Sequence, residues 1–63
     1  MPSNGEIIER NIQEFMRTQT HMLNARAENA TNTYNGLKDD YLLQKAILMS
    51  LGVNLTDIDK IKE

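Results

Sequence analysis

The apolar segment from Tyr41 to Leu51 restricts the fold of this chain more than any other feature of its sequence. A helix over this segment is apolar around most of its circumference, and such a helix must be buried on several sides. One neighbouring helix of similar length cannot cover it. The segment therefore predicts that the chain associates with a second copy of itself, with another protein, or with both. Its apolar positions are Tyr41, Leu42, Leu43, Ala46, Ile47, Leu48, Met49 and Leu51.

Apolar residues from Ile8 to Ala30 recur at spacings of three, four and seven, which predicts an amphipathic helix over about residues 5–33. A second helix is expected over about residues 38–51. The connection near 31–36 is rich in Asn and Thr and contains Asn35-Gly36, a frequent turn pair. These features favour a helical hairpin. The same helical phase also continues from Met16 to Leu51, so one long coiled-coil helix remains an alternative.

Gly52 directly follows the apolar segment, and Val53 comes next, as expected where a helix ends in a left-handed glycine. Thr56 can cap a further short helix over about residues 56–62. The sequence thus predicts one small all-α domain over residues 1–63, either a hairpin or a long helix, with a short C-terminal helix.

Self-association follows from size as well as from pattern. A chain of 63 residues buries a small core, and it has no cysteine for disulfides or thiolate metal sites. We therefore expect a helical bundle or coiled coil formed by several copies. The residues predicted to carry association or partner binding are Ile8, Ile12, Phe15, Met22, Tyr41, Leu42, Ile47, Leu48 and Leu51.

No pattern for catalysis, cofactor binding or metal binding stands out. His21 is the single histidine and has no cysteine or evident carboxylate partner, and the three glycines are far apart. We expect a non-catalytic regulator, adaptor or assembly factor that acts through protein–protein interaction. We also expect a cytoplasmic location, because cysteine is absent and neither a signal peptide nor a membrane span is recognisable.

Apolar residues surround Gly52 at a regular spacing, namely Ile47, Leu51, Val53, Ile58 and Ile61. In these residues, and with Gly52 at the turn, residues 43–62 resemble the helix-turn-helix of DNA-binding proteins, although Leu48 stands where a small residue is usual. The resemblance implies DNA binding by the helix after Gly52. Counted to Glu63, that helix would carry three acidic and two basic residues, which disfavours phosphate contacts, as does the net charge of −2.

The first expected helix contains Asn11, Phe15, Arg17, Gln19, Thr20 and Leu23. In these residues it resembles the Rop family, helical hairpins that dimerise into four-helix bundles and bind RNA. The resemblance implies that Asn11, Phe15 and Gln19 face RNA and that Thr20, Leu23 and Ala27 lie in core layers. Basic residues of that RNA face are replaced here by Asn4, Ile7 and Glu14, and Arg26 remains.

Overall fold

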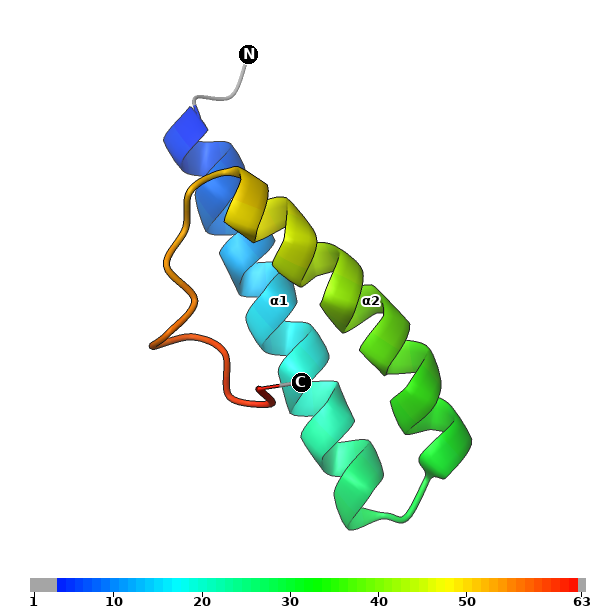
Figure 1. The fold of residues 1–63 in the computed structure, drawn as a ribbon. Coiled ribbons are helices and arrows are strands. Elements are labelled where there is room, and N and C mark those ends of the chain that lie inside the picture. The colour runs from blue at the N-terminus through cyan, green and yellow to red at the C-terminus, as the bar shows by residue number, and fades with distance from the viewer. Residues whose placement is uncertain (1–3, 63) are drawn as a thin grey trace.

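The computed structural model describes residues 4–62, which form an antiparallel helical hairpin followed by an irregular C-terminal segment (Figure 1). Helix α1 spans Asn4–Ala27 and helix α2 spans Thr31–Ser50. Within the described residues there are two helices and no strand. The hairpin prediction is confirmed, and the alternative of one continuous helix is wrong.

The turn between the helices lies at residues 28–30, earlier than the sequence indicated. Asn29 adopts a left-handed conformation with φ 58°, and Ala30 N–H donates to the carbonyl of Ala25 at 2.8 Å. This arrangement ends α1 in the manner of a Schellman motif. The expected bounds of 33 for the first helix and 38 for the second are therefore wrong, and Asn35-Gly36 lies inside α2.

Packing explains why α2 includes residues 31–36, which are weak helix formers. An early turn leaves Tyr34 and Leu37 on the same side of α2 as Tyr41 and Leu48, where all four contact the core. Tertiary burial of such a stripe outweighs the low helix propensity of Asn, Thr and Gly. The hairpin therefore has a longer second helix than local sequence preferences predict.

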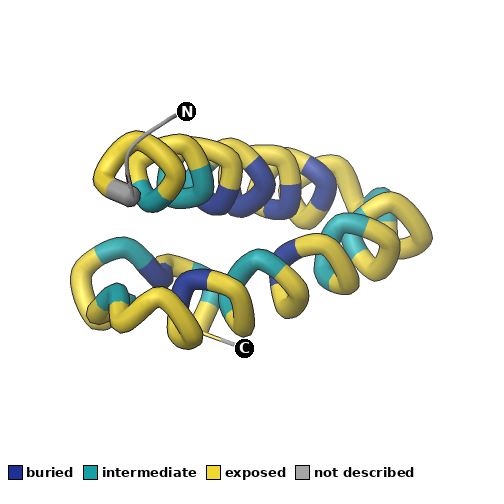
Figure 2. Tube along the Cα trace, turned by 90° about the horizontal axis from the view of Figure 1, so that it is seen from above, coloured by how far each residue is buried: buried dark blue, intermediate teal, exposed yellow. Residues whose placement is uncertain are grey.

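The core lies between the two helices, where Figure 2 shows the buried positions facing one another. Phe15 and Met22 of α1 pack with Tyr41 and Leu48 of α2, and all four side chains are 0% exposed. The rings of Phe15 and Tyr41 are stacked, with centroids 5.2 Å apart and planes 18° apart. Offset stacking of this kind is favourable beyond simple burial.

Helix α2 ends as the sequence predicted. Gly52 has φ 80°, its N–H donates to Met49 O at 3.1 Å, and Val53 N–H donates to Leu48 O at 3.0 Å. Val53 also packs against the core cluster that contains Leu48, which completes the apolar contact of a Schellman motif.

The predicted short helix over 56–62 is wrong. Residues 53–62, which we call the tail, run back beside α1 as an irregular segment (Figure 1). One helical turn forms, in which Leu55 O accepts the N–H groups of Ile58 and Asp59. The next two amides, those of Lys60 and Ile61, instead donate to the side chain of Gln19. Helical hydrogen bonding therefore stops after a single turn.

The two described glycines in and after α2 have opposite requirements, which gives a first prediction. A methyl group at either position meets no atom within 4 Å, so backbone conformation alone decides the effect. Gly36→Ala should raise the free energy of unfolding by about 0.5–1 kcal/mol, because alanine favours helix interiors. Gly52→Ala should lower it by about 1 kcal/mol, because alanine is strained at positive φ. Urea unfolding followed by circular dichroism measures both changes in the free energy of unfolding. Changes of the same sign would contradict the placing of Gly36 in a helix interior and of Gly52 at positive φ.

Candidate interaction surface

The nine residues predicted for association fall into three structural groups. Phe15, Met22, Tyr41 and Leu48 are fully buried inside one chain, where they form its core. Ile8 and Ile12 are half-buried on α1, and Ile12 packs against the core. The remaining three, Leu42, Ile47 and Leu51, are exposed. The exposed group presents more of its surface to a partner than the other two groups while the hairpin stays closed.

The exposed group belongs to a larger apolar surface on α2. Leu42, Leu43, Ile47, Met49 and Leu51 are 43%, 62%, 38%, 61% and 41% exposed, and Ala46 is exposed among them. We call these six residues the outer α2 face. Leu43 and Ile47 lie one helical turn apart on the side away from Tyr41 and Leu48. The outer α2 face is therefore what remains of the apolar segment once α1 has covered its inner side.

The shape of the molecule leaves this face open. The structure measures 40 × 23 × 16 Å, and one helix with its side chains is about 10–12 Å across. The tail packs against the core, contributing Val53, Leu55, Ile58 and Ile61. It does not hide the large side chains of the outer α2 face, which keep the exposures given above.

A buried glutamine fixes the tail to α1. Gln19 is 1% exposed, and its side-chain amide donates through Nε2 to Ile58 O at 2.8 Å. Its Oε1 accepts from Lys60 N–H at 2.5 Å and from Ile61 N–H at 3.1 Å. One side chain thus satisfies three main-chain groups of the tail, groups that would otherwise be costly to desolvate.

A buried aspartate fixes the tail to α2. The Tyr41 hydroxyl donates to Asp59 Oδ1 at 2.5 Å, and Lys45 Nζ lies 2.9 Å from Asp59 Oδ2. Lys62 N–H also donates to Asp59 Oδ1, at 2.8 Å. We call Gln19, Tyr41, Lys45 and Asp59 the tail clasp. Charge-assisted bonds of this kind are stronger than bonds between neutral groups.

The clasp changes the acidity of its charged members. Burial is the largest single influence on Asp59 and acts to raise its pKa, but the bonds from Tyr41, Lys45 and Lys62 N–H together lower that pKa below its ordinary value. The hydrogen bond to Asp59 is the largest influence on Lys45 and raises its pKa. Both directions favour the charged pair over a wide pH range.

The structure places several residues of α1 differently from what the resemblance to the Rop family implies. Phe15 and Gln19 do not face solvent, because Phe15 lies in the core and Gln19 binds the tail. The residues that the resemblance placed in core layers, Thr20, Leu23 and Ala27, are exposed. The structure is a helical hairpin, but its residues are not divided into core and RNA face in the way that the resemblance implied.

The helix-turn-helix expectation fails on structure. Residues after Gly52 form no second helix within the described part of the chain, so nothing corresponds to a recognition helix. Asp59, which would lie on that helix, is buried in the clasp. The prediction of a helix-turn-helix over residues 43–62 is therefore wrong.

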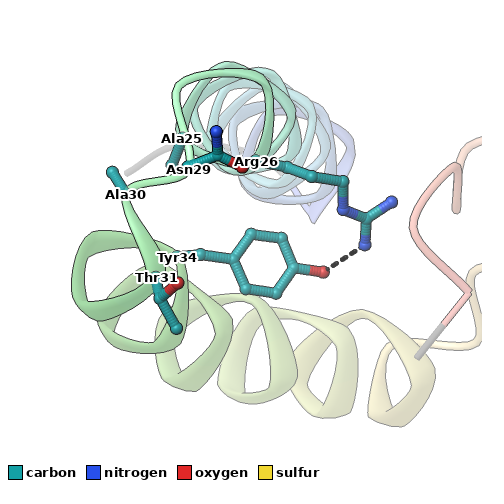
Figure 3. Close-up of a pocket in the computed structure, with 6 residues that line it drawn as sticks. All are labelled: Ala25, Arg26, Asn29, Ala30, Thr31 and Tyr34. Carbon is teal, nitrogen blue, oxygen red and sulfur yellow. Dashed lines mark hydrogen bonds between the residues drawn. The ribbon is translucent and has the colours of Figure 1, made fainter.

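A small pocket of about 200 Å³ lies at the turn between the helices (Figure 3). Arg26 Nη2 donates to Tyr34 Oη at 2.7 Å, and the guanidinium carbon lies 5.1 Å from the centre of the Tyr34 ring. These contacts join the last turn of α1 to the first turn of α2. They give Arg26 a structural role in closing the hairpin. The lining residues are Ala25, Arg26, Asn29, Ala30, Thr31 and Tyr34.

The described residues bring no three His, Asp or Glu side chains together in a way that could hold a metal ion. His21 is exposed on α1. Within residues 4–62, neither helix is both long enough and apolar enough to cross a membrane. No protein-family model, curated protein or solved structure matches the chain.

Proposed function

We propose that this chain is a non-catalytic protein–protein interaction module that associates through the outer α2 face, with a second copy of itself as the partner. The observation that carries the proposal is the concentration of exposed apolar side chains on one helix. Among the residues that the structure describes, seven large hydrophobic side chains are exposed, and five of them lie from Leu42 to Leu51. A contiguous apolar surface on a small protein is typical of an interaction site.

Burial of this face supplies a driving force for association. Full burial of one leucine, isoleucine or methionine side chain contributes about 1.5–3 kcal/mol, and those on the face are already partly covered. Several such side chains together contribute enough to offset part of the cost of immobilising a partner. Leu43 and Ile47, at the centre of the face, form an i,i+4 ridge that can pack into the groove of another helix.

A second copy suits this face because a twofold axis places the same surface on both sides. The centre of the face, at Leu43, Ala46 and Ile47, carries no charge, so two copies bring no like charges together there. The module then acts as a regulator, adaptor or assembly factor. In the dimer, the surface outside the outer α2 face stays accessible to other molecules. The cysteine-free composition is compatible with the cytoplasmic location that we propose for it.

A double substitution tests the proposal. Leu43→Glu with Ile47→Glu places two charges on the outer α2 face, and Asn35→Glu is the matched control at an exposed position of the same helix. We expect sedimentation velocity to show a dimer for the wild type and the control. The double variant should be a monomer with unchanged helicity, because both side chains point away from the core.

Two outcomes would contradict this proposal. One is a wild-type protein that sediments as a 7.2 kDa monomer up to millimolar concentration. The other is a double variant that still forms the wild-type dimer. If the wild type is a monomer and binds another protein through Leu43 and Ile47, the partner of the outer α2 face is that protein and the proposal of a second copy is wrong.

A further inference from the structure

The tail lies on the hairpin in the way that a peptide lies in a binding site. Its side chains Val53, Leu55, Ile58 and Ile61 pack against the core formed by α1 and α2. Above this apolar contact, Gln19 binds main-chain groups of residues 58, 60 and 61. Tyr41 and Lys45 bind one carboxylate, that of Asp59. Main-chain bonds of this kind give affinity, and the carboxylate gives specificity.

Several hydrogen bonds of the tail join two groups of the tail itself. Asn54 Oδ1 accepts from Thr56 N–H at 2.9 Å, Leu55 O accepts from Ile58 and Asp59, and Asp59 Oδ1 accepts from Lys62. The bonds between the tail and the helices come from the side chains of Gln19, Tyr41 and Lys45. None of these contacts requires that tail and hairpin belong to the same chain.

The covalent joint between hairpin and tail is short. The Schellman bonds of Gly52 and Val53 N–H to α2 are the last main-chain hydrogen bonds to the helix, and residues 53–54 connect them to the turn that begins at Leu55. A change of backbone conformation at Val53 and Asn54 therefore moves the tail as a unit. Exchange of an identical element about such a joint is a route to dimers of low energetic cost, because each contact is remade in the other copy.

We propose that the groove of the hairpin accepts the tail of a second copy in place of its own, so that two copies exchange tails reciprocally. The partner is an irregular segment with the pattern Ile-Asp-x-Ile of residues 58–61, which is bound by Gln19, Tyr41 and Lys45. This surface is separate from the outer α2 face, and the exchange does not depend on association through that face.

Complementation between two full-length variants tests the exchange. Gln19→Ala damages the groove and leaves the tail intact, whereas Asp59→Ala damages the tail and leaves the groove side chains intact. When the two are mixed, the tail of the Gln19→Ala chain can enter the groove of the Asp59→Ala chain. We expect the mixture to gain helical circular dichroism and a heterodimer beyond the average of the separate samples. The matched control is Asp59→Ala mixed with the double variant Gln19→Ala/Asp59→Ala, which offers no intact tail and should show no gain.

A labelled peptide of residues 51–63 gives a second measurement on the same groove. It should bind the Asp59→Ala chain at least about tenfold more tightly than the wild-type chain, whose own tail competes. A peptide with Asp59→Asn should bind the same chain at least about tenfold more weakly. If Asp59→Ala is partly unfolded, the wild-type peptide should restore its helical signal. A mixture equal to the average of its parts, together with a peptide that neither binds nor restores helicity, would overturn the proposal.

Discussion

Phe15→Ala should leave most of the chain unfolded at 25 °C. The Phe15 side chain is fully buried and stacked on Tyr41, so its removal leaves a cavity beside a second aromatic ring. Substitutions of this kind cost about 3–5 kcal/mol. Native proteins have about 0.05–0.15 kcal/mol of stability per residue, which makes a chain of 63 residues vulnerable to such a loss. Far-UV circular dichroism and thermal unfolding measure the effect directly.

The matched control for this prediction is Leu43→Ala, which truncates a large side chain that is mostly exposed. Its effect on the stability of the monomer should be below about 1 kcal/mol. The comparison also tests the role implied by the Rop resemblance. A folded Phe15→Ala protein that has lost affinity for RNA would contradict the assignment of Phe15 to the core.

Asp59→Ala should detach the tail and destabilise the chain by about 2–3 kcal/mol. Three donors, Tyr41 Oη, Lys45 Nζ and Lys62 N–H, lose a charged acceptor in a mostly buried place. The apolar contacts of Ile58 and Ile61 weaken with it, because the clasp holds them on the core. Hydrogen exchange at the amides of Lys60 and Ile61, which bind Gln19, should become much faster. Unchanged protection of these two amides would contradict the clasp.

The same carboxylate gives a prediction for pH. Asp59 has a folded pKa below its ordinary value of about 4, so its contribution to stability is fully present above that value and is lost as pH falls through the folded pKa. The pKa of Lys45 is raised, so its contribution is lost only as pH rises above about 10.4. The difference in stability between wild type and Asp59→Ala should therefore be constant between these limits and shrink below pH 4. Urea titrations across this range measure the difference. A difference that grows in acid would contradict the lowered pKa of Asp59.

Helical periodicity was sufficient to predict the class of fold and most of the core. Phe15, Met22, Tyr41 and Leu48 lie on the expected stripes, and Gly52 ends α2 in the expected conformation. The turn was misplaced because Asn35-Gly36 is the stronger local signal, whereas long-range packing of Tyr34 and Leu37 decided the outcome. Local preference is a weak guide where burial competes with it.

The tail was beyond sequence reasoning for a different reason. Its apolar spacing and capping residues fit a helix, and the competing bonds come from Gln19, about forty residues earlier in the chain. The sequence around a buried glutamine on an amphipathic helix does not indicate which groups it will bind. Leu42, Ile47 and Leu51 of the outer α2 face are among the residues predicted to carry association, and that role stays a prediction. Leu43 and Met49 could be added only when Tyr41 and Leu48 had identified the covered side.

Isotope-filtered nuclear Overhauser spectroscopy on a mixture of labelled and unlabelled chains tests the central claim most directly. It detects contacts between copies and assigns them to individual methyl groups. Association through the outer α2 face predicts intermolecular signals at the methyl groups of Leu43 and Ile47. A sample at millimolar concentration with no intermolecular signal at either residue would contradict it.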